Sequence, residues 1–108
     1  MIIEMRTYHC APARMSALQD RFNNHTMGFF EKYGIKPLGF WTTLVGNDNH
    51  ELMYLLEWKD MAEREAKWNA FQSDPQWIAR RAESEAQAPI LARISNQFLA
   101  PCAFFKPK

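Results

Sequence analysis

Three polar residues near the start of the chain, Glu4, Arg6 and Tyr8, alternate with apolar ones in the stretch IIEMRTYH. A period of two is typical of a β-strand, and it places the three side chains on one face. A carboxylate beside a guanidinium and a phenol can bind or polarise a small oxyanion, with Arg6 or Tyr8 holding developing negative charge. The structural alternative is a buried ionic row that fixes the register of a dimer. The pattern leaves open which face of the sheet holds the row.

His25 is the candidate general base or haem ligand. It lies beside an apolar stripe with steps of three and four, which predicts a helix packed on a sheet. The stripe consists of Met15, Leu18, Phe22, Thr26, Phe29 and Tyr33. We therefore expect the imidazole to point toward the sheet or to the rim of that contact. The alternative is a core histidine with one satisfied hydrogen bond.

Aromatic residues are frequent enough to line a flat pocket for a planar ligand. The candidate ligand-binding residues are Glu4, Phe22, Phe29, Trp41, Tyr54 and Trp58. The alternative is that the same rings form the core of a small domain, since each buries ~150–250 Å². Catalysis through His25, Arg6 and Tyr8 and simple ligand binding both remain open.

Other chemistries lack their residues. His9, His25 and His50 do not stand at metal-ligand spacing, and Cys10 and Cys102 follow no such spacing either. We therefore predict no metal site and no organic cofactor. The chain also has no nucleophile elbow, phosphate loop or dinucleotide fingerprint, which excludes hydrolase, kinase and nicotinamide-dependent functions.

Composition indicates one globular domain over residues 1–108. The net charge is +1 and 47% of the residues are hydrophobic, which argues against both nucleic-acid binding and disorder. No apolar run approaches the ~20 residues of a membrane-spanning helix, and the N-terminus has no signal-peptide layout. We expect a cytoplasmic protein with reduced thiols.

The central stretch predicts a β-hairpin, with strands over 38–45 and 51–58 joined by a turn at 46–49. Alternation places Leu38, Phe40, Thr42 and Leu44 on one face of the first strand. Neither strand has a wholly polar face, which predicts a sheet that is covered on both sides.

The flanking segments complete the predicted elements. A first strand runs over 2–9, and a helix starts at Ala11-Pro12 and ends at Gly34. A second helix, capped by Asp60, passes residue 71, bends at 73–75 and ends near residue 88. A last strand covers 90–99, and the tail 100–108 carries Phe104 and Phe105.

The order β-α-β-β-α-β predicts an α+β, ferredoxin-like fold: a four-stranded antiparallel sheet with the helices on one face. The other face then lies bare although its strands are apolar. Exposed apolar surface on that scale indicates a partner, and a second copy of the chain is the simplest one. We expect a homodimer or a higher homo-oligomer, with the tail contacting the partner subunit.

Several motifs resemble the NIPSNAP family: MIIEMRTY at the start, HTMGFFEKYGIKPLGFWTTLVG in the middle, and NHELMYLLEWKDMAEREAKWNAF followed by DPQW. The resemblance covers essentially the whole chain and is closest to the short bacterial members. It implies a dimeric α/β-barrel, in which two ferredoxin-like sheets pack face to face. It implies no settled activity.

Three functions remain after these exclusions. The first is a homodimer of unassigned biochemical role that binds a small hydrophobic or aromatic molecule between helices and sheet. The second is a cofactor-independent monooxygenase- or isomerase-like enzyme, as in distant relatives with this architecture. The third is a non-catalytic assembly module. An enclosed cavity of at least ~300 Å³ with convergent polar groups would favour a ligand over a plain module.

Overall fold

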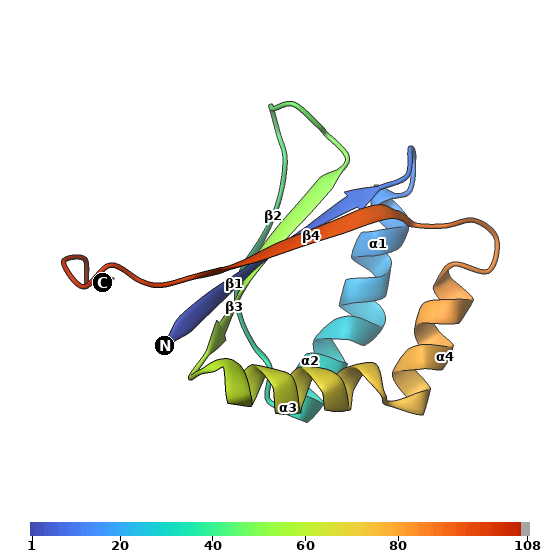
Figure 1. Cartoon of the computed structure of the whole chain (residues 1–108). Coiled ribbons are helices and arrows are strands. Elements are labelled where there is room, and N and C mark those ends of the chain that lie inside the picture. Colours follow the sequence, from blue (N-terminus) through green and yellow to red (C-terminus); the bar gives the residue numbers. More distant parts are fainter. Residues whose placement is uncertain (107–108) are drawn as a thin grey trace.

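The computed structural model describes residues 1–106 and confirms the predicted α+β, ferredoxin-like architecture. The strands are β1 (Ile2–Cys10), β2 (Lys36–Thr42), β3 (Glu51–Trp58) and β4 (Leu91–Leu99). They form one antiparallel sheet in the order β2-β3-β1-β4. The helices α1 (Met15–Arg21), η1 (Phe22–Thr26), α2 (Met27–Tyr33), α3 (Met61–Gln72) and α4 (Pro75–Ser84) all lie on one side of it (Figure 1).

The second strand of the predicted hairpin is confirmed, but the first was wrong at both ends. β2 starts at Lys36 and ends at Thr42, and residues 43–50 form a loop in which Leu44 and Val45 are 91% and 92% exposed. The loop makes a local hydrogen bond, in which the N–H of His50 donates to Asp48 Oδ1 at 2.8 Å, and the carbonyl of His50 accepts from Cys10 N of β1 at 2.7 Å. Bonds of the first kind compete with a strand ladder, and the ladder ends before Leu44.

The first helix differs from the prediction in where it starts and in which of its residues face the sheet. It begins at Met15 rather than at Pro12, because Ala13 adopts a positive φ of 65° in the preceding turn. Residues 22–26 form a π-helical turn, in which the N–H of Met27 reaches the carbonyl of Phe22. The wider turn keeps residues four apart on one face.

The stripe of buried residues along α1, η1 and α2 therefore consists of Leu18, Phe22, Thr26 and Phe30. Phe29 is only half-buried. The turn residues at the helix ends follow the prediction. Gly34 ends α2 with φ 68°, and the side chains of Asp60 and Asp74 accept hydrogen bonds from the first turns of α3 and α4. Helix α4 ends at Ser84, four residues before the expected end, and β4 starts one residue late.

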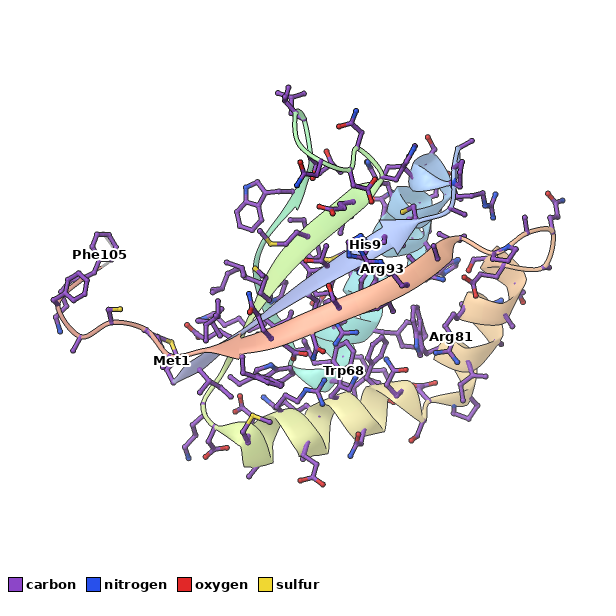
Figure 2. All side chains as sticks on the ribbon, turned by 45° about the horizontal axis from the view of Figure 1, so that its top comes forward. Met1, His9, Trp68, Arg81, Arg93 and Phe105 are labelled. Atoms are coloured by element: carbon purple, nitrogen blue, oxygen red, sulfur yellow. The ribbon has the colours of Figure 1, made fainter. Side chains whose placement is uncertain are left out.

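The core lies between the sheet and the helices and is largely aromatic. Its least exposed side chains include those of Leu18, Phe30, Tyr54, Trp58 and Phe71, each at 1% or less. Figure 2 shows Trp68 on this side of the sheet. Among residues 1–106, no helix is long and apolar enough to cross a membrane.

None of residues 1–106 covers the opposite face of the sheet, so the prediction of one bare face holds for the described part of the single subunit. On this face Ile3, Met5, Met53 and Leu55 are half-buried. The segment after β4 extends away from the body of the domain (Figure 1), and its Phe104 and Phe105 are 88% and 68% exposed.

Candidate functional site

The row of Glu4, Arg6 and Tyr8 faces the helices rather than the open side of the sheet. Glu4 is fully buried, and Arg6 and Tyr8 are each 8% exposed. A dimer that packs through the open face of the sheet would not contact this row. The interpretation of the row as a device that fixes the register of such a dimer is therefore wrong. The row instead lies inside the subunit, between β1 and the helix layer.

Glu4 is the centre of a buried polar cluster whose donors come from four elements. Arg6 Nη1 donates to Oε2 at 3.0 Å, and Asn96 Nδ2 of β4 donates to the same oxygen at 2.9 Å. Trp58 Nε1 of β3 donates to Oε1 at 3.1 Å, and Arg64 of α3 donates to both oxygens. Burial by itself raises the pKa of this carboxyl, but the hydrogen bonds from Arg64 and Asn96 and the charge of Arg6 together hold the pKa below its ordinary value.

Arg6 connects Glu4 to two tyrosines. Its Nε donates to the Tyr54 hydroxyl at 2.9 Å, and that hydroxyl lies 2.9 Å from the hydroxyl of Tyr8. The guanidinium also stacks over the ring of Trp68, 4.3 Å from the centroid. Burial raises the pKa of Tyr54 well above its ordinary value, so this phenol stays neutral.

The cluster is satisfied internally, which limits what it can do chemically. Each charged group in it already has partners of opposite charge or hydrogen-bond partners within the protein. An incoming oxyanion would have to displace Glu4 from Arg6. The arrangement therefore stabilises one packing of α3 and β4 on β1, and the catalytic roles of Arg6 and Tyr8 stay predictions.

A groove along the edge strand β2 is the most ligand-like hollow of the domain. Its volume is about 430 Å³, and it opens between η1 and the β2 edge. Its lining is mostly apolar, with amide and hydroxyl groups among it: Gln19, Phe22, Asn23, Met27, Phe40, Trp41, Thr42 and Leu52. Among the residues that the structure describes, no charged side chain lines it.

The local geometry of both walls produces this groove. The π-helical turn carries Phe22 and Asn23 to the mouth, and π-turns of this kind are frequent at functional sites. On the other wall the Trp41 ring lies over Gly39, where a Cβ would stand 2.6 Å from the indole. The absence of a side chain at Gly39 thus allows the indole, half exposed, to lie along the strand edge.

The structure brings only part of the predicted ligand-binding set together. Phe22 and Trp41 line the groove. Glu4, Tyr54 and Trp58 are buried in the core, and Phe29 lies in a separate hollow with His25. Core burial, the alternative for the aromatic residues, describes Tyr54 and Trp58.

His25 does not point toward the sheet. It is half-buried on the side of η1 that faces α4, where it lines two shallow hollows with residues such as Asn24, Arg80 and Glu83. The π-helical turn changes the helical phase at this point. His25 is therefore not brought together with Arg6 and Tyr8, and its role as a base stays a prediction.

Several residues of the site were not identified from the sequence. Gln19, Met27, Phe40 and Leu52 line the groove, although the alternation in 38–45 placed Phe40 on a defined face. Arg64 of α3 binds Glu4 across 60 positions, and nothing local in the sequence indicates that contact.

This is a ferredoxin-like α+β domain of the type found in dimeric α/β-barrels. The sheet order, the helices on a single face and the groove at the sheet edge define it. The NIPSNAP family profile matches residues 3–106, and the chain belongs to the NIPSNAP family. A comparison with curated proteins returned no match.

Solved structures support the same assignment. An uncharacterized NIPSNAP domain protein from Burkholderia xenovorans is 25% identical, with a TM-score of 0.84 over 99% of this chain and 100% of that one. A NIPSNAP family protein from Agrobacterium tumefaciens is 16% identical, with a TM-score of 0.84 over 95% and 94%. A candidate antibiotic biosynthesis monooxygenase from Nitrosomonas europaea shares the fold alone, at 8% identity and a TM-score of 0.64 over 94% and 98%. The two NIPSNAP likenesses are to a protein described as uncharacterized and to one described only by its family, and the enzyme and assembly alternatives are not favoured.

Proposed function

We propose that this NIPSNAP protein is a homodimer that binds an uncharged, largely aromatic small molecule in the groove between η1 and β2. The single observation that supports this is the composition of the groove wall. Phe22, Phe40 and Trp41 offer flat apolar surface, and Asn23 and Thr42 offer hydrogen bonds.

The lining also selects the ligand class. A charged ligand would lose hydration without gaining a counter-ion, since the described lining residues are neutral. A neutral planar molecule with one or two hydroxyl or carbonyl groups suits the rings and the amides. The volume of about 430 Å³ is large enough for a molecule of this kind.

The test is a ligand panel followed by a matched pair of substitutions. Neutral naphthols and flavonoids are screened by tryptophan fluorescence and thermal shift, with aromatic carboxylic acids beside them. A ligand at 100 times its Kd stabilises the fold by ~2.7 kcal/mol. Asn23→Asp adds a charge to the groove and should weaken binding of a neutral ligand about tenfold, whereas Asn69→Asp, at an exposed position of α3 outside the groove, should not.

Two results would contradict the ligand proposal. One is a panel in which no neutral aromatic compound changes either signal. The other is equal binding by the Asn23→Asp and Asn69→Asp variants.

The open face of the sheet supports the homodimer. It exposes Trp41 at 50% and Leu99 at 39%, and it carries Met5 and Leu55 between them. An obligate interface of this kind buries ~2,000 Å² or more. The exposed Phe104 and Phe105 supply further apolar surface, and we assign the tail 100–108 to the partner subunit's side of the interface; residues 107 and 108 lie outside the described part of the chain.

Light scattering tests the dimer directly. We expect twice the chain mass of 12.7 kDa at micromolar concentration. Leu55→Glu places a charge on the open face and should give monomers, whereas Ile78→Glu, on an exposed position of α4, should leave the mass unchanged. A folded wild-type monomer would contradict the proposal. A cytoplasmic location belongs to the same proposal and is supported by the two free cysteines, Cys10 and Cys102.

A further inference from the structure

His9 lies at the end of β1 and carries a buried ring nitrogen without a hydrogen-bond partner. It is 7% exposed, and its Nδ1 makes no hydrogen bond within the described chain. On β3 it pairs directly with Glu51, and on β4 with Arg93, beside which it lies in Figure 2. A buried polar atom left unpaired costs free energy unless something binds it.

Two carboxylate oxygens point at this nitrogen. Asp48 Oδ2, from the loop between β2 and β3, lies 3.5 Å away, and Glu51 Oε1 lies 3.4 Å away. All three atoms lie within 4.8 Å of one another. These separations are long for hydrogen bonds of a charged imidazole, which are ~2.7–2.9 Å. The two separations from His9 Nδ1 suit a tetrahedral metal ion, whose ligand atoms stand ~3.3–3.6 Å apart when its bonds are ~2.0–2.2 Å.

The other polar atom of each side chain is held by a separate contact. His9 Nε2 lies 3.5 Å from Ser95 Oγ, Asp48 Oδ1 accepts from the N–H of His50, and Glu51 Oε2 accepts from Thr43 Oγ1 at 3.3 Å. Metal ligands in proteins are oriented by outer contacts of this type.

We propose that His9, Asp48 and Glu51 bind a divalent transition-metal ion such as Zn²⁺ or Co²⁺. His9 Nδ1, Asp48 Oδ2 and Glu51 Oε1 are the ligands, and a water molecule occupies the fourth position on the exposed side. An imidazole nitrogen in the set favours such an ion over Mg²⁺, which prefers oxygen ligands alone. This site departs from the prediction of no metal, because its three residues come together only in the folded sheet. It lies apart from the groove and does not depend on the proposed ligand.

The experiment is calorimetric titration of the metal-stripped, full-length protein with Zn²⁺, with Mg²⁺ as a second arm. We expect one Zn²⁺ per chain and no Mg²⁺ binding at the same concentration. Asp48→Asn and Glu51→Gln keep the side-chain size at partly exposed positions, and each should weaken Zn²⁺ binding about tenfold or more. His9→Gln should abolish it, and His25→Gln, which removes a histidine elsewhere, should not change it.

Co²⁺ provides a readout that a weak surface site would not give. The wild type should show the intense visible bands of tetrahedral Co²⁺, and the Asp48→Asn and Glu51→Gln variants should lose them while circular dichroism shows that they stay folded. The proposal is overturned if neither Zn²⁺ nor Co²⁺ binds, in which case His9 only forms an ion pair with the two acids. It is overturned equally if binding persists in both carboxamide variants, or if His25→Gln removes it.

Discussion

Glu4 and Arg64, 60 positions apart, form a two-pronged ion pair in which Arg64 Nε lies 3.2 Å from Oε1 and Nη2 lies 3.1 Å from Oε2. This pair joins the central strand β1 to α3. Because Glu4 is fully buried, water cannot replace Arg64 at its carboxylate when that partner is removed.

Replacing Glu4 should therefore be costly. Glu4→Gln keeps the shape but leaves Arg6 and Arg64 without a counter-ion, and we expect a loss of about 3–5 kcal/mol in the free energy of unfolding. Urea denaturation at neutral pH measures it. The matched control is Glu57→Gln, which breaks the exposed pair with Lys36 and should cost no more than about 1 kcal/mol. Equal losses for the two variants would show that the buried ion pair contributes no more to stability than the exposed one.

The same carboxyl should make stability depend on pH. The pKa of Glu4 is lowered from 4.5 in the folded protein, so the folded state binds fewer protons than the unfolded state. Its stabilisation is therefore present above about pH 4.5 and is lost as the pH falls through the lower, folded value. The difference in unfolding free energy between the wild type and Glu4→Gln should shrink as the pH falls further below 4.5. A difference that stays constant would mean that Glu4 does not titrate as the contacts imply.

Arg6 and Glu4 should couple in a double-mutant cycle. Arg6→Met keeps an apolar stem against Trp68 but leaves the Tyr54 hydroxyl with the Tyr8 hydroxyl as its remaining partner. With Glu4→Gln, the double variant should cost about 0.5–3 kcal/mol less than the two single losses combined. Strict additivity would show that Arg6 and Glu4 do not interact energetically, despite the 3.0 Å contact.

The π-helical turn makes Phe30, not Phe29, the deeper anchor of its helix. Phe30 is 1% exposed and touches Tyr54, Trp68 and Phe71. Phe30→Ala should cost about 3–5 kcal/mol. Phe29→Ala should cost clearly less, because that ring is half-buried. Thermal and urea unfolding measure the two losses of stability. A larger loss for Phe29→Ala than for Phe30→Ala would contradict this reading of the π-helical turn and favour the regular α-helix that the sequence predicts.

His25 should be dispensable for ligand binding in the groove. Its imidazole lies toward α4, and the groove opens between η1 and β2. His25→Asn should stay folded and dimeric and bind neutral aromatic ligands within twofold of the wild type, by the same fluorescence titration. A loss comparable to that of Asn23→Asp would place His25 at the ligand after all.

Local patterns determined much of the fold before any long-range contact was known. Alternation in 2–9 and 51–58 predicted β1 and β3, because a period of two is a property of the strand itself. Gly34, Asp60 and Asp74-Pro75 marked helix ends, because each acts on backbone groups within its own turn. These signals sufficed for the β-α-β-β-α-β order, whereas the family resemblance came from sequence motifs such as MIIEMRTY and DPQW.

Tertiary structure alone decided which faces these elements turn toward one another. Alternation showed that Glu4, Arg6 and Tyr8 share a face, but only the packing of Trp68 and Arg64 placed that face under the helices. The π-helical turn shifted burial from Phe29 to Phe30 and moved His25 away from the sheet, because core packing can outweigh regular helical geometry. His9 gained Asp48 and Glu51 as neighbours only when β1 and β3 paired, since contacts across about 40 positions have no local period to reveal them.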